Sequence, residues 1–412
     1  MINVPYVPPF FLRYIALISM LLCNYHIEAQ KDILQIKIPK TTDGIQVNAS
    51  DIISNIEYVS LETLPECLIG EFYKISISEN YILVFSSNEA KCFLFSRNGK
   101  FIRSIGQIGN GPGDYRKDSY SIKIDEKSNI VYLMSAFEIY SYRITGEFVK
   151  KFDFVAFKNS LGIKGFFFIR IMHWKDDLFC TNVDLNSGDE QYRFIIFSLD
   201  GKIIKHYPNY VHFNKEKGKN ENNFSASSIY FDCNIFCYDD QIYFKEILCD
   251  TLFMINEQLD LVPNIIFDLP EKSPDVFVQN VYKCENYLFL TGRSYYLYDK
   301  KKNKLTVIKH DPSVIREMEF KNLFITPKKA PFHGFTNDID GGFGFYPTLL
   351  HNIQNDKQFV CVYQPYELKK FLTDEYLATR KIKDKEAHKR LKKLLTELDE
   401  DDNPVIMIAT VR

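Results

Sequence analysis

The chain has 412 residues, of which 46% are hydrophobic and 25% charged, so it can bury a large core and has no compositional sign of disorder. Its formal net charge of -2, from 51 basic and 53 acidic residues, provides no basic surface for nucleic acid or for an anionic membrane. The 35 Phe and 26 Tyr residues stand beside a single Trp, and because aromatic residues favour strands, an all-β fold is expected.

Residues 1–29 are expected to be a signal peptide rather than part of the fold. Arg13 precedes the apolar stretch YIALISMLLC, whose length suits a secretory signal and falls short of the roughly 20 residues that span a bilayer. Cleavage after Ala29 would release an exported protein of the periplasm or cell envelope. Lipidation at Cys23 is the less favoured alternative, because Leu22 is larger than the residue that a lipobox places before its cysteine. No later apolar run has the length of a transmembrane span.

A unit of strand, short turn, strand, glycine turn and strand recurs along the mature chain. Six copies are expected, over residues 81–106, 130–152, 177–207, 241–267, 286–308 and 343–365. Gly99, Gly146 and Gly201 occupy the second turn of the first three copies, where glycine supplies the positive φ of a tight hairpin. Their spacing of about 50 residues is typical of one four-stranded blade. Residues 30–372 are therefore predicted to form a six-bladed β-propeller.

Both ends of the mature chain carry further elements. Residues 56–62 and 403–412 each have the pattern of a strand outside the repeat, and either can complete the last blade. Residues 373–402 are expected to form a helical extension with one apolar face, made of Leu391, Leu394, Leu395 and Leu398. The basic residues of this extension mix with acidic ones, which is typical of a solvated face rather than a membrane-binding one. The predicted fold class is all-β, a six-bladed β-propeller with a short C-terminal helix and a terminal closing strand that packs back on the ring.

Eight cysteines follow the signal peptide, and most lie in strand-like runs, where a cysteine behaves as a small buried hydrophobe. Buried free thiols are therefore expected, although export permits disulfides. Cys233 and Cys237 could instead pair or bind a metal, but no second Cys or His pair follows at a zinc-like spacing.

The stretch GQIGNGPGDY, residues 106–115, contains four glycines and a proline. It matches neither pattern of phosphate-binding loop, because no G-x-G-x-x-G opens a helix and no Gly-Lys-Ser or Gly-Lys-Thr ends the loop. Pro112 also removes a backbone donor that a phosphate cradle needs. The stretch is expected to join the outer strand of one blade to the inner strand of the next.

This loop and the strand after it, IGQIGNGPGDY and IKIDEKSNIVYLMS, resemble the NHL-repeat propeller pattern, in which a glycine-rich loop with an aromatic residue precedes a strand. The chain as a whole resembles a six-bladed β-propeller family of exported Bacteroidetes proteins. Four stretches carry this resemblance: IEYVSLETLPECLIGEFYKI, NGKFIRSIGQIGNGPGDY, NDIDGGFGFYP and EDDNPVIMIATVR. The resemblance implies export to the cell envelope and a binding role there.

Two groups of residues are candidates for ligand binding near the channel of the propeller. Asp114, Tyr115 and Arg116 end the glycine-rich loop, and an Arg and a Tyr at a channel rim suit a carboxylate or sugar ligand. Turn chemistry is the simpler interpretation of these three. His173 and Trp174 place an imidazole beside an aromatic face, although such a pair more often fills an interface between blades.

A third candidate is the stretch NDIDGG, which the family resemblance includes. Asn337, Asp338 and Asp340 offer oxygen ligands suited to Ca²⁺, but no Glu follows at EF-hand distance, and a turn capped by aspartates is the favoured interpretation. Glu71 lies where the resemblance to six-bladed lactonases places an acidic calcium ligand. Glu71, Asp338 and Asp340 are thus the candidate metal ligands.

Two functions follow from these observations. The favoured one is a non-enzymatic envelope propeller without a cofactor, which binds an envelope protein or a small carbohydrate-like ligand, and no nucleic acid. The alternative is a calcium-dependent hydrolase or lyase, similar to a lactonase, with its site in the central channel. Fold-level analogy is compatible with both.

Overall fold

The strands of the molecule form antiparallel hairpins whose turns use residues with positive φ. Gly99, Gly146 and Gly201 have φ values of +87°, +89° and +84°, as the hairpin prediction requires. The computed structural model describes residues 33–412 apart from 41–42, 71–72, 119, 164–170, 184–189, 211–232, 247–248, 271–277, 293, 310–314, 317–329, 332–333, 348–350 and 354–356. The predicted signal peptide, with Arg13 and Cys23, lies outside the described residues.

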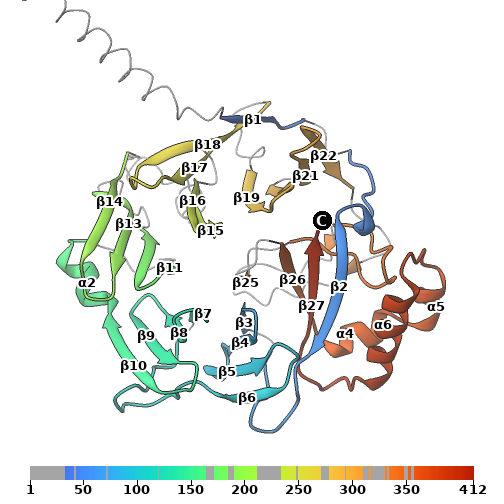
Figure 1. The fold of residues 1–412 in the computed structure, drawn as a ribbon, viewed down its shortest axis with the longest axis horizontal. Coiled ribbons are helices and arrows are strands. Elements are labelled where there is room, and N and C mark those ends of the chain that lie inside the picture. The colour runs from blue at the N-terminus through green and yellow to red at the C-terminus, as the bar shows by residue number, and fades with distance from the viewer. Residues whose placement is uncertain are drawn as a thin grey trace, which may run out of the picture.

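Six small antiparallel sheets, the blades, stand in a ring, which confirms the predicted six-bladed propeller (Figure 1). Blade 1 consists of β3 (Tyr73–Ile77), β4 (Tyr81–Ser86), β5 (Lys91–Ser96) and β6 (Phe101–Ser104). Blade 2 consists of β7 (Ser121–Asp125), β8 (Ile130–Met134), β9 (Glu138–Arg143) and β10 (Phe148–Asp153). Blade 3 consists of β11 (Ile171–Lys175), β12 (Leu178–Asn182), β13 (Tyr192–Ser198) and β14 (Ile203–Pro208).

The next two blades repeat this order from the centre of the ring outward. Blade 4 consists of β15 (Cys233–Tyr238), β16 (Gln241–Glu246), β17 (Thr251–Ile255) and β18 (Leu261–Asp268). Blade 5 consists of β19 (Val278–Lys283), β20 (Tyr287–Gly292), β21 (Tyr295–Asp299) and β22 (Lys304–Ile308). Because the innermost strands all run in one direction, their hairpins to the second strands lie on one face of the ring. We call this side, which carries the hairpins at 78–80, 126–129, 176–177, 239–240 and 284–286, the hairpin face.

Blade 6 is built from both ends of the described chain. Its central strand is β27 (Val405–Val411), which pairs on one side with β26 (Gln358–Tyr363) and on the other with β2 (Ile53–Ser60). Residues 56–62 and 403–412 were each expected to be able to complete the last blade, and strands from both segments belong to blade 6. The sixth copy of the repeat supplies β26 and also β25 (His351–Ile353), which pairs in parallel with β3 of blade 1.

A belt formed by residues 33–52 runs along the outer edges of blades 4 and 5 before it enters blade 6. Its strand β1 (Leu34–Lys37) adds to blade 4 by pairing in parallel with β18. Further along, Ile45 exchanges backbone hydrogen bonds with Val307 and Lys309 beside blade 5. The short helix η1 (Ala49–Asp51) then leads into β2. The belt thus covers edge strands that would otherwise be open to solvent.

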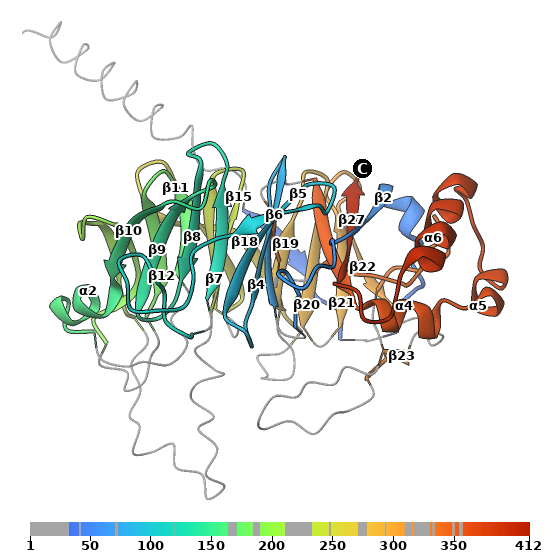
Figure 2. The same cartoon turned by 90° about the horizontal axis from the view of Figure 1, so that it is seen from below.

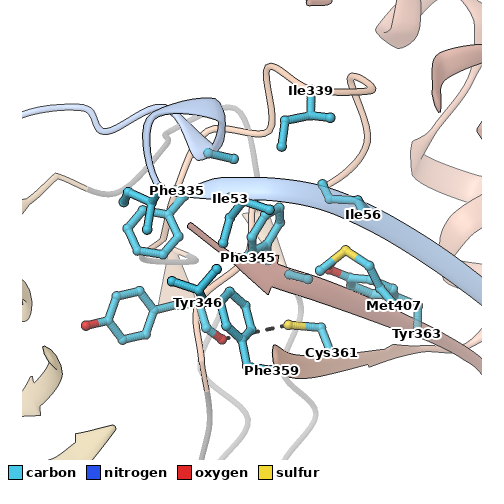
Figure 3. Close-up of a cluster of buried hydrophobic side chains, with 14 of the residues drawn as sticks. Ile53, Ile56, Phe335, Ile339, Phe345, Tyr346, Phe359, Cys361, Tyr363 and Met407 are labelled. Carbon is cyan, nitrogen blue, oxygen red and sulfur yellow. Dashed lines mark hydrogen bonds between the residues drawn. The ribbon is translucent and has the colours of Figure 1, made fainter. Parts of the chain in front are cut away.

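A cluster of buried hydrophobic side chains lies between each pair of neighbouring blades, so every blade is stabilised by the next. The cluster between blades 5 and 6 is shown in Figure 3, where Ile53 of β2, Phe359 of β26 and Met407 of β27 meet Phe345 and Tyr346. These side chains are almost fully buried. Strands from both ends of the chain therefore share one core.

Several short helices lie outside the ring. Three of them, α4 (Pro365–Phe371), α5 (Asp374–Ala378) and α6 (Lys385–Glu397), stand together beside blade 6 (Figure 2). Residues 373–402 thus contain two helices rather than one continuous helix, and Asp384 caps the second by accepting from the backbone of Glu386 and Ala387. Leu391 and Leu398 of the predicted apolar face are buried against blade 6, and Leu394 and Leu395 are partly buried there. Two small elements complete the description: α2 (Phe154–Ser160), and the pair β23 (Ile315–Arg316) and β24 (Ala330–Pro331).

No two of the eight described cysteines form a disulfide. Six of them are buried, whereas Cys237 is exposed and Cys249 is half-buried. In the part of the chain that the structure describes, no helix is long and apolar enough to cross a membrane.

Candidate functional site

The glycine-rich loop is held by its own aspartate. The Asp114 carboxylate accepts hydrogen bonds from the backbone of Gly111 at 2.8 Å and from the side chain of Gln107 at 3.1 Å. Gly113 has a φ of +89°, and a Cβ there would lie 2.5 Å from Cγ of Phe148. The loop joins β6 to β7, as expected, and its carboxylate stabilises the turn.

Tyr115 and Arg116 point to different surroundings. Tyr115 is 1% exposed and packs edge-on against Phe85 and Tyr120 between blades 1 and 2, where burial raises the pKa of its hydroxyl. The exposed guanidinium of Arg116 lies 3.6 Å from Glu138, a buried carboxylate that also accepts from the Tyr140 hydroxyl. Tyr115 is therefore part of the core, whereas Arg116 is available at the surface.

His173 and Trp174 face opposite sides of blade 3, because successive residues of a strand alternate. His173 stacks on Tyr132 of blade 2 with ring centroids 4.5 Å apart. Trp174 donates from Nε1 to the Asp240 carbonyl of blade 4 at 2.9 Å, and the Lys175 ammonium lies 4.3 Å from its ring. The pair therefore fills two different blade interfaces and does not form a single platform.

Asp338 of the NDIDGG stretch connects three distant parts of the chain. Its carboxylate accepts from the backbone nitrogen of Ser50 at 2.9 Å and from the Ser50 hydroxyl at 2.6 Å. The Lys383 ammonium lies 3.1 Å from the same carboxylate and donates to the Ser50 hydroxyl at 2.6 Å. Burial alone would raise the pKa of Asp338, but these hydrogen bonds outweigh it and hold the pKa below its ordinary value. Asp338 thus clamps the belt to the C-terminal helices.

Asp340 is the second carboxylate of this clamp and is 1% exposed. It accepts from the Asn337 side chain at 2.6 Å, from the backbone of Gly342 at 2.8 Å and from the Tyr58 hydroxyl of β2. Its backbone carbonyl accepts from Nδ1 of His388 at 2.7 Å. Despite these donors, burial raises the pKa of Asp340.

Two of the three candidate metal ligands, Asp338 and Asp340, lie in the described part of the chain. The oxygens of Asp338 and Asp340 are used by protein donors, and Glu71 lies outside the described residues. Among the residues that the structure describes, no three His, Cys, Asp or Glu side chains gather closely enough to hold a metal ion. The carboxylates of Asp338 and Asp340 alone thus do not form a site for Ca²⁺, which takes six or more oxygens.

A buried polar network between blades 3 and 4 was not anticipated from the sequence. Arg193, which is 1% exposed, donates from Nε to Glu246 at 2.5 Å and from Nη1 to the Val183 carbonyl at 2.9 Å. The register of β13 shifts between Tyr192 and Phe194, and such a bulge changes the direction of a side chain, so the alternation of the strand could not locate Arg193. Lys245 lies next to Glu246 and is fully buried, and this burial lowers the pKa of Lys245 to about 8.

Polar side chains also join the innermost strands of blades 4 and 5, next to Lys245, which is the cross-strand neighbour of Asn234. The Asn234 side chain of β15 donates to the Asn280 side chain of β19 at 2.5 Å, and Asn280 donates to the Thr291 hydroxyl at 2.8 Å. Tyr210 is 54% exposed, and its hydroxyl interacts with Glu246. We call these residues, Arg193, Lys245, Glu246, Asn234, Asn280, Thr291 and Tyr210, the polar network. They lie at the strand ends opposite the hairpin face.

A family model described as a domain of unknown function, DUF4934, matches residues 33–410. The chain belongs to the DUF4934 family. This match covers all six blades and the C-terminal helices, and it gives the family that the sequence resemblance left unnamed. The family description makes no mention of NHL repeats. No curated protein matches the chain.

Several solved structures resemble the chain at low sequence identity, among them proteins of Bacteroides. An exported protein of Bacteroides fragilis is 16% identical with a TM-score of 0.59, over 92% of this chain and 99% of its own. A DUF4221 member of Bacteroides vulgatus is 9% identical with a TM-score of 0.41, over 65% of this chain and 86% of its own. Virginiamycin B lyase of Staphylococcus aureus is 13% identical with a TM-score of 0.36, over 62% of this chain and 74% of its own. At these identities the likeness concerns the fold only.

Proposed function

We propose that this DUF4934 chain is an exported binding module of the cell envelope, which holds a small polar ligand or a segment of an envelope protein at the polar network. The ring supplies a rigid frame, and the network supplies donors and acceptors at the strand ends opposite the hairpin face. Binding of this kind requires no cofactor. The predicted signal peptide and the exported relative from Bacteroides fragilis support the assignment to the envelope.

The observation that carries the proposal is the burial of the Arg193–Glu246 pair at 2.5 Å. Removing two charges from water is costly, and a well-packed apolar pair of similar volume would stabilise a blade interface equally well or better. The charged pair therefore serves something other than stability. Buried, oriented charges beside amide side chains are what a protein uses to recognise a polar ligand.

The neighbouring groups fit this role. Asn234 and Asn280 come from the innermost strands of two blades, and their amides hydrogen-bond to each other across the blade interface. Tyr210 adds an exposed aromatic surface next to Glu246, and such surfaces suit sugars and peptide side chains. A rigid site of this type loses little conformational entropy when it binds.

The test compares two asparagines at opposite ends of blade 5. Asn280→Ala removes an amide of the polar network, whereas Asn286→Ala removes one at the hairpin face, where Asn286 donates to the Arg412 carbonyl at 2.8 Å. The purified full chain and both variants would be applied to a glycan array and to a peptide array made from envelope proteins. We expect a ligand that binds the wild type and Asn286→Ala but binds Asn280→Ala about tenfold more weakly. Equal binding by the two variants would overturn the proposal.

A further inference from the structure

Three charged side chains meet on the outer part of blade 2. Glu138 begins β9 and Lys151 lies on β10, which are the third and the outermost strands of this blade, and Arg116 ends the glycine-rich loop that leads into the blade (Figure 1). Nη2 of Arg116 lies 3.6 Å from Oε1 of Glu138, and the Lys151 ammonium contacts the same oxygen. We call these three residues the blade 2 triad.

The triad carries more positive charge than its carboxylate requires. The Glu138 side chain is 6% exposed, and a buried carboxylate needs a cation or hydrogen-bond donors to replace its lost hydration. Lys151 already contacts Oε1, and the Tyr140 hydroxyl donates to Oε2. Arg116 is a second cation on the same carboxylate, so one positive charge is left in excess.

This excess charge is open to solvent. The side chains of Arg116 and Lys151 are 71% and 41% exposed. Among the described residues, Glu138 is the only ion-pair partner of either cation. A guanidinium has five N–H donors and an ammonium has three, so most of the donors of this pair still face water. An anion in solution can therefore reach both cations without displacing any side chain of the core.

Buried tyrosines hold the loop that carries Arg116. The Tyr120 hydroxyl donates to the Arg116 carbonyl at 3.2 Å, and the Tyr142 hydroxyl donates to the Gly113 carbonyl at 2.7 Å. Both tyrosines are 1% exposed and belong, with Tyr140, to the hydrophobic cluster between blades 1 and 2. The backbone on which the guanidinium is mounted is thus fixed before a ligand arrives, which reduces the entropy lost on binding.

We infer that the blade 2 triad binds a carboxylate group presented from solution, on an acidic sugar or on a peptide. The two oxygens of a carboxylate match the parallel N–H donors of a guanidinium, and the neighbouring ammonium adds a further charge-assisted hydrogen bond. The two cations already converge on one carboxylate oxygen, that of Glu138, so their spacing suits this group. A phosphate monoester would place a second negative charge beside Glu138 and would lose more hydration. The inference does not rest on the proposed function, because the triad and the polar network share no residue.

The test uses the full chain with two carboxylates, D-glucuronate and N-acetyl-triglycine. Their neutral counterparts are D-glucose and the amidated form of the same peptide, and glucose 6-phosphate is the phosphate probe. Binding would be measured by calorimetry at low ionic strength, because salt screens exposed charges. We expect at least one carboxylate to bind about tenfold or more tightly than its neutral counterpart, and the carboxylate that does so identifies the source as a sugar or a peptide.

Arg116→Gln and Lys151→Met should each weaken carboxylate binding about tenfold. Lys150→Met is the matched control, because Lys150 is an exposed lysine of the same strand that pairs with Ser141, whereas Lys151 pairs with Tyr140. Adjacent residues of a strand face opposite sides of the sheet, so the control should bind like the wild type. Arg116→Gln should also leave the Tm nearly unchanged, because exposed ion pairs contribute little to stability.

Glu138→Gln separates a binding role from a structural one. The amide keeps nearly the same shape but removes the negative charge that competes for the two cations, so the affinity for the carboxylate should rise about threefold or more. Absence of binding by both carboxylates, tighter binding of glucose 6-phosphate than of D-glucuronate, weaker carboxylate binding by Glu138→Gln, or equal affinities of the wild type and Arg116→Gln would each overturn the inference. The polar network variant Asn280→Ala should bind the carboxylate normally, so failure of one proposal can be distinguished from failure of the other.

Discussion

Replacement of Asp338 by alanine should loosen the contact between the belt and the C-terminal helices. Asp338 is 5% exposed, and it accepts from the Ser50 backbone at 2.9 Å and from the Ser50 hydroxyl at 2.6 Å. A hydrogen bond to a charged group contributes about 1.5–3 kcal/mol. The Lys383 side chain is 59% exposed, so its ion pair with Asp338 contributes only about 0–1 kcal/mol.

Water can replace part of these bonds, because Ser50 is only half-buried. We therefore expect Asp338→Ala to lower the free energy of unfolding by about 2–4 kcal/mol. For a chain of this size, this corresponds to a fall in Tm of roughly 2–5 °C, measured by scanning calorimetry. Asp260→Ala is the matched control, because Asp260 pairs with Lys205 at 3.3 Å at an exposed position. If both variants had the same Tm, the clamp would contribute nothing and the reasoning would be refuted.

Three further predictions concern the turns, the clamp and metal ions. Gly113 and Gly146 share a φ of +89°, but only at Gly113 would a Cβ meet Phe148, at 2.5 Å. Gly113→Ala should therefore lower the free energy of unfolding by at least about 1 kcal/mol more than Gly146→Ala, and should show the lower Tm of the two. Equal losses would show that the contact with Phe148 is relaxed without cost. The pKa of Asp338 is lowered in the folded protein, so the carboxylate should contribute fully to stability above its ordinary pKa and lose this contribution as the pH falls through its folded pKa. The Tm difference between wild type and Asp338→Asn should therefore be constant above about pH 5 and shrink below about pH 4. A Tm difference that grows on acidification would contradict this prediction. Removal of divalent ions with a chelator should leave the Tm unchanged, and a stoichiometric Ca²⁺ found by elemental mass spectrometry, with a lower Tm after its removal, would favour the hydrolase alternative.

The architecture could be predicted because its signals are local. The glycine turns at Gly99, Gly146 and Gly201 and the alternation of the strands between them are properties of short segments, and they define one blade each. The composition of blade 6 could be predicted only in part, because its three strands come from residues about 50, 360 and 405 along the chain. Pairing in register over such separations, and the parallel addition of β1 to blade 4, leave no local pattern in a single sequence.

The candidate site was harder to predict for the same physical reason. Asp338 and Asp340 have the spacing of cation ligands, but their actual partners include Ser50, which is 288 residues away. The alternation rule, applied to His173 and Trp174, already implied that neighbours on a strand face opposite interfaces. The polar network depends on a bulge at Arg193, and nothing in the residues around it marks the change of register.

The belt has a mechanical consequence for any protein or surface that pulls on the chain from its N-terminal side. Such a force reaches β1 before it reaches β2, and β1 lies parallel to β18, so the two strands would be loaded in shear along four paired residues. The hydrogen bonds of Ile45 beside blade 5 are loaded next, and the clamp at Asp338 after them. The seam between β2 and β27, which keeps the ring closed, bears the force last. The contacts of the belt would therefore break before the pairing of β2 with β27, and the propeller would stay closed while the belt is pulled away.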